Sequence, residues 1–283
     1  MILIGESGST KTSWSLVYPN RIVELVNTAG VNPVLMTGDE IESVIRPVLA
    51  ELHNTVPDMI HFYGAGCGSE KVRMDMAYAL NNVFESESIV VESDLIGACL
   101  ALCGSSPGIV GILGTGSNSC YWGGNSILEQ TPSLGFILGD EGSGSALGKR
   151  LMSDFLKRQM PIDLQLKFHE QYDVSPEIAI QRVYKSPFPN RYLAGFTHFI
   201  SANIENEYCQ NLVENAFEQF IDRNLRNYSV LQKAPVSFSG SIAHVFQNQL
   251  KKVCKLHNVR IKTIVKEPIG LLAQNIQTRH YAQ

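Results

Sequence analysis

The pattern of apolar and polar positions near the N-terminus predicts two strands joined by a glycine-rich turn. Residues 1–4 form an apolar run, and residues 13–18 alternate between polar and apolar side chains. The run between them, residues 5–12 with the sequence GESGSTKT, is close to a phosphate-binding P-loop, G-x-x-x-x-G-K-S/T. However, Thr10 replaces the second glycine, and a strand rather than a helix follows. We therefore predict a strand–turn–strand unit, extended by a third strand over residues 21–26.

A second unit of the same kind begins at residue 108. Strands are predicted over residues 108–113, 119–122 and 126–130, and residues 114–118, with the sequence GTGSN, form the turn between the first two. Gly8, Ser9 and Trp14 recur as Gly116, Ser117 and Trp122, always 108 residues later. An ordinary hairpin turn would explain either unit alone, because hairpins favour glycine, asparagine and serine. Two copies at a constant offset favour duplicated halves that close on one phosphate group.

The segments after each unit alternate between helix and strand. In the first half, a loop over residues 27–33 is followed by helices over residues 39–52, 70–80 (with Ser69 as N-cap) and 94–102, and by strands over residues 59–63 and 88–91. In the second half, strands over residues 235–239 and 259–263 alternate with helices over residues 142–159, 242–256 and 270–281. When a mostly helical insert over about residues 143–232 is set aside, both halves have the order βββαβα.

This order predicts an α/β fold with two lobes around a central cleft. We expect residues 1–106 to form the N-terminal lobe and residues 107–267, with the insert, to form the C-terminal lobe. A final helix over about residues 268–283 is expected to pack back on the first lobe.

Composition and charge narrow the classes of protein. Hydrophobic residues make up 44% and charged residues 18% of the 283 residues, as in a globular protein with a sizeable core. The net charge of −4 gives no general attraction to nucleic acid. The sequence shows neither the ~18 uninterrupted apolar residues of a membrane helix nor a secretory signal. We therefore expect a cytoplasmic protein.

The cysteines and histidines do not suggest a metal centre. The six cysteines include no C-x-x-C pair, and the seven histidines show no spacing typical of zinc ligands. We expect reduced, buried thiols and no structural zinc site.

The repeated βββαβα order with hydroxyl-rich glycine turns resembles the actin, Hsp70 and sugar-kinase superfamily. Within it, five motifs are similar to the N-acetylglucosamine kinase branch, also known as the BadF/BadG/BcrA/BcrD ATPase family. In the family's order, they are residues 5–12 (GESGSTKT), 92–94 (ESD), 114–118 (GTGSN), 139–144 (GDEGSG) and 238–242 (FSGSI). The resemblance implies a duplicated ribonuclease H-like (actin-like ATPase) fold and an ATP- and Mg²⁺-dependent sugar kinase of carbohydrate metabolism. Similar kinases are commonly homodimers.

The resemblance implies that the two glycine turns hold the phosphates of ATP. The residues concerned are Gly8, Ser9, Thr10 and Lys11 in the first turn and Gly114, Thr115 and Gly116 in the second. Backbone N–H groups and hydroxyls in such turns form a nest for an anion. The adenosine side of the cleft would be formed by Ala194, Gly240 and His244. For His244, an exposed helix histidine without a ligand is an equal alternative.

Two aspartates account for the sugar chemistry that the resemblance implies. Asp94, at a strand end just before a helix, matches the catalytic base that accepts the proton of the attacking sugar hydroxyl and thus also contacts the sugar. Alternatively it is a helix N-cap, although Ser93 could serve instead. Asp140 matches a sugar-binding carboxylate, which can accept hydrogen bonds from two hydroxyls. Asn32 matches a sugar-contacting asparagine.

The remaining expected contacts concern the metal and the identity of the sugar. Glu6 stands where many relatives have aspartate and would hold Mg²⁺, with water between them in many members. Ser133, Leu134 and Gly135 occupy another sugar-contacting segment, but its sequence departs from the N-acetylglucosamine kinase form. N-acetylglucosamine, glucosamine and a muramic derivative therefore all stay open. Glu141 could assist Mg²⁺, and structural support of its turn is the favoured interpretation.

Two alternatives have the same fold. One is an ATPase activator of a dehydratase or reductase, which would hold a metal cluster between subunits through cysteines; no suitable close cysteine pair lies near a glycine turn. The other is a non-catalytic sensor of nucleotide or sugar.

Overall fold

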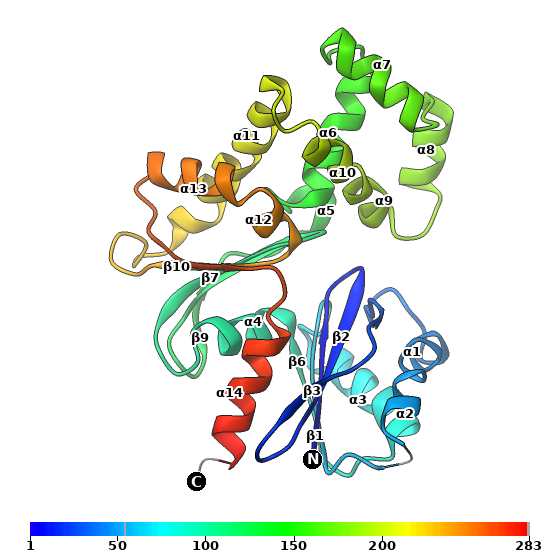
Figure 1. Cartoon of the computed structure of the whole chain (residues 1–283), viewed down its shortest axis with the longest axis vertical. Coiled ribbons are helices and arrows are strands. Elements are labelled where there is room, and N and C mark those ends of the chain that lie inside the picture. Colours follow the sequence, from blue (N-terminus) through cyan, green and yellow to red (C-terminus); the bar gives the residue numbers. More distant parts are fainter. Residues whose placement is uncertain (54, 282–283) are drawn as a thin grey trace. The chain divides into compact units, whose positions relative to one another are not determined.

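The computed structural model describes residues 1–53 and 55–281, and Figure 1 shows the course of the chain. The chain forms two compact units, each described here by itself. The first contains Met1–Val110, Trp122–Ile127 and the returning segment Glu267–Gln283, and the second contains Gly111–Tyr121 and Leu128–Lys266. Residues 282–283 of the expected final helix lie outside the described residues. No helix in the described ranges has the length and apolar character needed to cross a membrane.

The sheet of the first unit has the strand order β3-β2-β1-β5-β6, with β4 paired to β2. Its strands are β1 (Ile2–Ser7), β2 (Lys11–Val17), β3 (Ile22–Glu24), β4 (Thr28–Ala29), β5 (Met59–Gly64) and β6 (Ile89–Ser93). β1 is antiparallel to β2 and parallel to β5, which is in turn parallel to β6. The first glycine turn therefore joins two antiparallel strands, which confirms that it is not a P-loop.

Helices cover both faces of this sheet. They are α1 (Gly38–Ile45), α2 (Val48–Glu51), α3 (Glu70–Phe84), α4 (Asp94–Leu102) and α14 (Ile269–Tyr281). Successive side chains of a strand point to opposite faces, so Leu3 joins a core cluster with residues of α1 and α3, whereas Ile2 and Ile4 join a cluster with residues of α4 and α14. α14, the red helix in Figure 1, packs against α4 and β2.

Three element boundaries in this unit differ from the sequence predictions. The helix expected over residues 39–52 is two helices, because Pro47 lacks an N–H and α1 ends at Ile45 before it. α3 extends beyond the expected end to Phe84, where Glu85 in the left-handed conformation stops it. The expected loop over residues 27–33 contains β4, which pairs with the start of β2.

The second sheet repeats the topology of the first. Its strands are β7 (Gly108–Leu113), β8 (Ser117–Trp122), β9 (Ile127–Gln130), β10 (Val236–Ser239) and β11 (Ile261–Val265). Their order, β11-β10-β7-β8-β9, places the first strand at the centre, with the second and third on one side and the last two on the other. The order β6-β5-β1-β2-β3 does the same. The duplicated α/β fold predicted from the sequence is confirmed.

The two strand–turn–strand units correspond at an offset of 106 residues rather than 108. β1 and β7 are both six residues long, and each is followed by a three-residue turn. β2 begins at Lys11 and β8 begins at Ser117, a difference of 106 (117 − 11). Gly8 therefore corresponds in position to Gly114, and the identity of Gly8 with Gly116 is not the structural equivalence.

The second unit contains the helical insert and the helices that flank β10. They are α5 (Gly135–Leu138), α6 (Gly144–Leu156), α7 (Ile162–Gln171), α8 (Pro176–Tyr184), α9 (Pro189–Gly195), α10 (Thr197–Ala202), α11 (Glu207–Arg223), η1 (Leu225–Asn227), α12 (Ser241–Val245) and α13 (Gln247–Leu256). The single helix expected over residues 242–256 is interrupted at Phe246, whose side chain is buried. α5 was not predicted, because one exposed turn of helix leaves no periodic pattern.

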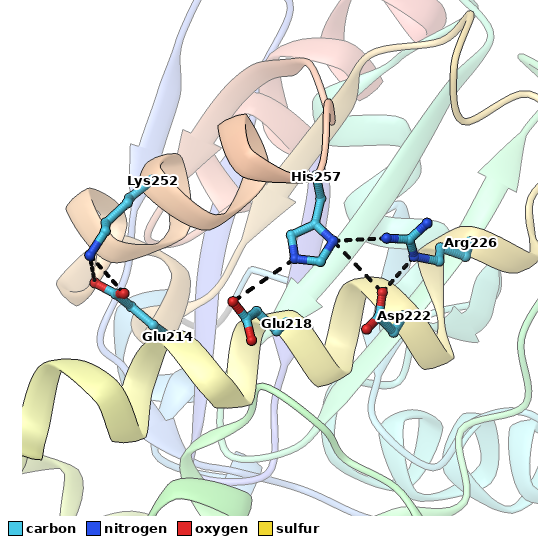
Figure 2. A network of polar contacts seen from close by, with 6 residues as sticks. All are labelled: Glu214, Glu218, Asp222, Arg226, Lys252 and His257. Atoms are coloured by element: carbon cyan, nitrogen blue, oxygen red, sulfur yellow. Dashed lines mark hydrogen bonds and ion pairs between the residues drawn. The ribbon is translucent and has the colours of Figure 1, made fainter.

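α11 and α13 pack side by side with a polar network along their edge (Figure 2). Glu214, Glu218 and Asp222 lie one helical turn apart on α11 and face Lys252 and His257. Lys252 Nζ lies 2.7 Å from Glu214 Oε1, and the Asp222 carboxylate also contacts Arg226. Because most of these groups are exposed, the network contributes modestly to stability, and the buried face of α11 supplies the core contacts.

Candidate active site

The first turn, residues 8–10, is held by buried hydroxyl groups at the strand ends on either side. Ser7 Oγ and Thr12 Oγ1 lie 2.7 Å apart, and Thr12 Oγ1 donates to the Ala29 carbonyl at 3.0 Å. Ser7 Oγ also accepts the Val31 N–H at 3.0 Å. These bonds tie the turn to residues 28–31 without any charged group.

Gly30 completes this support by a close backbone approach. Its N–H donates to the Thr10 carbonyl at 2.9 Å. A Cβ at Gly30 would lie 2.5 Å from the Gly8 carbonyl oxygen, so only glycine fits without a shift of the turn. The turn that the sequence predicts to bind phosphate is therefore fixed by its contacts with Gly30, a residue for which the sequence analysis predicted no role.

Four charged side chains interact with one another next to this turn. Glu6 projects from β1 and Lys11 from the start of β2, while Asp94 begins α4 and Glu267 precedes α14. Burial raises the pKa of Glu6 to about 7, with further increases from the negative charges of Asp94 and Glu267 and an opposing effect of Lys11. Lys11 Nζ forms an ion pair with Glu267 Oε2 at 2.6 Å. The structure thus brings Glu6, Lys11 and Asp94 into one electrostatic group, as residues of one site require.

Asp94 occupies the first position of α4, directly after β6. Ser93 is the N-cap, because its hydroxyl accepts the Ile96 N–H, so Asp94 is not needed for capping. The Leu95 N–H donates to Asp94 Oδ1 at 2.9 Å. Burial raises the pKa of Asp94 to about 6, and the backbone hydrogen bonds oppose that rise. A carboxylate with this pKa is ionised at neutral pH and still basic enough to accept a proton.

The carboxylates of this group suit a magnesium ion that arrives with a nucleotide. The described residues contain no cluster of three or more histidine, cysteine, aspartate or glutamate side chains arranged for a metal. Mg²⁺ does not require one, because it is commonly bound by one or two carboxylates together with substrate phosphates and water. Glu6 offers hard oxygen donors, and a cation would relieve its repulsion with Asp94.

Asn32 lies just beyond the segment that supports the first turn. Its Oδ1 accepts the Val34 N–H at 3.0 Å, which leaves the Nδ2 group as the donor end of the amide. Gly66, with a positive φ of 86°, packs against this oxygen so closely that a Cβ would overlap it. The side chain that the sequence assigns to the sugar is therefore oriented by a neighbouring loop.

The second turn, residues 114–116, is held by a buried carboxylate. Asp140 Oδ1 accepts the Ser117 N–H at 3.0 Å, and Asp140 has a φ of 59°, in the left-handed region. Burial raises its pKa, while the bond from Ser117 opposes the rise. The turn carbonyls of Gly114 and Thr115 accept the N–H groups of Gly144 and Ser145 at 2.8 and 3.0 Å. Asp140 therefore has a structural role in addition to the sugar contact expected of it.

The residues expected on the adenosine side gather around this turn, with one exception. Ala194 Cβ would be 3.1 Å from a Cβ placed on Gly144, whose N–H binds the turn. Gly240, at a φ of 114°, lies so close to Leu113 that a Cβ would overlap the Leu113 carbonyl oxygen. His244 lies one turn along α12 and is exposed. A nucleotide contact of His244 stays a prediction.

A hydrogen bond joins the segment of Ser133, Leu134 and Gly135 to the strand that follows the second turn. Ser133 Oγ donates to the Ser117 carbonyl at 3.1 Å, on the residue whose N–H binds Asp140. Leu134 is exposed, and Gly135, at a φ of 71°, starts α5. Glu141 instead forms an ion pair with Arg223, which agrees with structural support rather than metal binding.

Sequence reasoning missed Glu267, Gly30 and the role of Asp140 in its own turn. Glu267 is 256 positions from Lys11 (267 − 11), and no local pattern links the two. Gly30 lies in a predicted loop, where a glycine carries little information. The glycine-rich sequence around Asp140, GDEGSG, did carry a signal, because aspartate tolerates a left-handed backbone conformation.

Comparisons with known proteins define the class of this chain. No protein-family model matches it, and no curated protein sequence matches it. A crystal structure from Porphyromonas gingivalis, a putative N-acetylglucosamine kinase, shares 36% sequence identity and a TM-score of 0.92, covering 99% of this chain and 100% of the other. A putative N-acetylglucosamine kinase from Chromobacterium violaceum has a TM-score of 0.65 at 14% identity, covering 97% and 98% of the two chains. A ROK family glucokinase from Streptomyces griseus, in complex with glucose and AMPPNP, has a TM-score of 0.62 at 14% identity, covering 98% and 99%.

The last two similarities establish the fold, which is that of the actin-like sugar kinases. The similarity to the P. gingivalis protein, at 36% sequence identity over nearly the whole of both chains, also establishes a family relationship. The chain belongs to the family of the putative N-acetylglucosamine kinase from P. gingivalis.

Proposed function

We propose that this protein is an ATP-dependent kinase that phosphorylates a hydroxyl of an amino sugar, with N-acetylglucosamine as the first candidate. Asp94 is the observation on which the proposal rests most. It is a partly buried carboxylate at a strand end, relieved of capping by Ser93, and its pKa is raised to about 6. The relationship to a putative N-acetylglucosamine kinase supports the choice of sugar.

In the proposed reaction, the sugar hydroxyl oxygen attacks the γ-phosphorus of ATP and its proton passes to Asp94. The bond between the γ-phosphorus and the bridging oxygen breaks, and ADP leaves with that electron pair. The Leu95 N–H holds Oδ1 of Asp94, so the other carboxylate oxygen would receive the proton. The helix N-terminus at Asp94 favours its ionised form before transfer. Much of the catalysis of phosphoryl transfer is positioning and charge neutralisation, which an ordinary aspartate can support.

The two turns would hold the polyphosphate. Gly8, Ser9 and Thr10 offer a turn that is fixed by Gly30, and Lys11 follows with a positive charge. Gly114, Thr115 and Gly116 offer a turn whose three carbonyls all accept hydrogen bonds, from Gly144, Ser145 and Gly114 respectively, so its backbone is fixed before an anion binds. When bound, Mg²⁺ neutralises phosphate charge, and Glu6 would hold it.

The sugar would be oriented by Asn32, Asp140 and the segment of Ser133, Leu134 and Gly135. Asn32 presents an amide donor, because its oxygen is occupied by the Val34 N–H. Such a donor suits a hydroxyl oxygen or the carbonyl of an N-acyl group. Asp140 keeps one oxygen for Ser117 and has the other to accept from a sugar hydroxyl.

The buried cysteines favour this proposal over a cluster-binding ATPase activator. All six cysteines of the chain are buried and free of disulfides. A thiol that holds a cluster between subunits must reach the surface. We therefore retain the sensor of nucleotide or sugar as the second candidate, because it needs the same binding residues without the base.

The proposal is tested by ADP release, coupled to NADH oxidation, with a panel of N-acetylglucosamine, glucosamine, N-acetylmannosamine, N-acetylmuramic acid and glucose. Release that depends on one amino sugar, with the phosphorylated sugar identified by mass spectrometry, is the expected result. Nucleotide binding without sugar-dependent release for any member would favour the sensor. Iron and colour in the purified protein would favour the activator.

A further inference from the structure

Lys11 forms an ion pair with Glu267, although the proposed function needs the ammonium group of Lys11 to bind the nucleotide phosphates. Lys11 follows directly on the first turn, and its Nζ lies 2.6 Å from Glu267 Oε2. The two side chains are 39% and 38% exposed, so solvent and a ligand can reach both. In this arrangement a protein carboxylate takes the place beside Lys11 that a phosphate oxygen would take.

The two partners differ in how firmly they are anchored. Lys11 starts β2, where it pairs with Ala29 of β4, and its carbonyl accepts the Gly8 N–H at 3.0 Å. Glu267 lies outside any helix or strand, between β11 and α14, and it is the first residue of the segment that returns to the first unit. A competitor for Lys11 would therefore displace Glu267 rather than Lys11.

The balance of charge favours such a displacement. An ion pair between half-exposed groups has little net stability, whereas a polyphosphate offers several charged oxygens to one ammonium group. Glu267 also adds to the negative charge around Glu6, together with Asp94. Phosphates entering this group would repel Glu267 and attract Lys11, so both effects act in the same direction.

We propose that Glu267 is a positioning residue that holds Lys11 beside the first turn in the absence of nucleotide and competes with the nucleotide phosphates for it. This inference rests on the proposed function. Nucleotide binding then exchanges one partner of Lys11 for another, and it releases Glu267 from the turn. Glu267 sets the affinity for ATP without taking part in the transfer itself.

The test measures ATP binding by calorimetry for the wild type, Glu267→Gln and Glu87→Gln. Glu87 is an exposed glutamate two residues before β6, at the opposite end of that strand from Asp94, so its variant controls for the loss of one negative charge. We expect Glu267→Gln to bind ATP about two- to fivefold more tightly, as expected when an ion pair of this strength no longer competes. We expect Glu87→Gln to match the wild type. Adenosine, which has no phosphate, should bind all three proteins equally.

Two further measurements separate the ion pair from a general change of potential. In a Lys11→Met background, the effect of Glu267→Gln should disappear, whereas a long-range effect of charge would persist. The difference between wild type and Glu267→Gln should also narrow as ionic strength rises, because screening weakens the competing pair. In steady-state kinetics, the change should appear in KM for ATP, with kcat within about twofold.

The outcomes distinguish this inference from the proposed function. If the wild type binds ATP and Glu267→Gln binds it no more tightly than Glu87→Gln, the competition is refuted and the kinase proposal stands. If Glu267→Gln increases the affinity for ATP by the same factor in the Lys11→Met background as in the wild type, the competition is also refuted. If the wild type binds no ATP, the proposed function and this inference both fail.

Discussion

In the first strand–turn–strand unit, neutral hydroxyls hold the turn and charged groups surround it, whereas in the second unit a buried carboxylate holds the turn itself. Ser7 and Thr12 perform in the first unit the supporting task that Asp140 performs in the second. Glu6 and Asp94 are not needed to hold the first turn, and the Leu95 N–H that donates to Asp94 Oδ1 offsets only part of the effect of burial. Their pKa values rise to about 7 and about 6, because burial is not fully compensated.

This difference shows how a duplicated topology can divide its tasks. The two sheets share one strand order, so the turns occupy equivalent positions. The first turn has ionisable groups poised near neutral pH, which suits proton transfer and metal binding. The second has backbone groups in fixed directions, which suits binding alone. We expect substitutions in the first unit to alter activity more than stability, and substitutions in the second to do the reverse.

The largest effect should come from the two aspartates, Asp94 and Asp140. If Asp94 is the base, Asp94→Asn lowers kcat by about 10²- to 10⁴-fold. The same change should raise the melting temperature at pH 7.5, because it removes a charge whose burial is costly. Asp140→Ala should instead lower stability by about 1–3 kcal/mol, since it leaves the buried Ser117 N–H without its acceptor.

Asp140→Asn is the matched control, because its side-chain oxygen can still accept from Ser117 and asparagine tolerates the left-handed conformation. Its melting temperature should lie much closer to the wild type than that of Asp140→Ala. Denaturant unfolding and steady-state phosphorylation are measured on all three variants. Full activity of Asp94→Asn would contradict its assignment as the base, and an unchanged stability of Asp140→Ala would contradict the structural role.

Much of this comparison could be predicted from the sequence, because the residues that favour a turn are neighbours in the chain. Glycine and hydroxyl residues between two apolar runs predicted both turns, and the alternation after them predicted the order of strands and helices. Ser69 and Ser93 cap their helices as local patterns suggest. The break at Pro47 was equally local and was missed, because the apolar periodicity on either side of it continues.

The features that the sequence analysis did not predict depend on contacts between residues that are distant in the chain. Identical residues in the sequence aligned Gly8 with Gly116 at an offset of 108 residues. Alignment of equivalent strands in the two sheets gives an offset of 106 residues instead (117 − 11). The pair of Lys11 and Glu267 arises only after α14 packs on β2. Asp140 was predicted as a ligand contact, and its bond to Ser117 joins residues 23 positions apart in the chain, which meet only after the chain folds back.

The pH dependence of stability is a second and smaller test of the first unit. The pKa of Glu6 is raised from 4.5 to about 7, so the unfolded chain releases this proton at a lower pH than the folded protein does. The stabilisation of the folded state by the protonated form is present below about pH 4.5 and is lost as the pH rises to about 7. Without Mg²⁺ or nucleotide, Glu6→Gln should therefore be more stable than the wild type at pH 7.5, by about 1–2 kcal/mol after allowance for partial exposure.

Unfolding by urea at pH 4, 5, 6 and 7.5 measures this effect. The stability curves of the wild type and Glu6→Gln should meet near pH 4 and separate above pH 5, while Glu87→Gln follows the wild type. A constant difference at all pH values would show that Glu6 contributes by packing and not by its charge. In the wild type, activity should rise through an acidic limb between about pH 6 and 7, which belongs to the coupled carboxylates Asp94 and Glu6 together.

The smallest effect that still separates the two turns comes from their glycines. A Cβ on Gly116 would lie 3.0 Å from Asp140 Oδ2 and 3.1 Å from Oδ1, whereas a Cβ on Gly8 would meet nothing closer than the Lys11 carbonyl oxygen at 4.0 Å. Asp140 is buried and bonded to Ser117, so it cannot withdraw without losing that bond. Gly116→Ala should therefore destabilise the protein by about 1–2 kcal/mol. Gly8→Ala should be neutral or stabilise it by less than about 1 kcal/mol, because alanine restricts the unfolded chain.

Each of the two variants adds one methyl group to a glycine, so the two free energies of unfolding can be compared without a correction for side-chain type. In the Asp140→Ala background, the cost of Gly116→Ala should shrink, because the obstructing carboxylate is gone, and the cost of Gly8→Ala should not change. Double-mutant cycles from urea unfolding provide both numbers. Equal costs for the two glycines in the wild-type background would mean that the carboxylate does not define the second turn, and the proposed division of tasks between the units would then lose its structural basis.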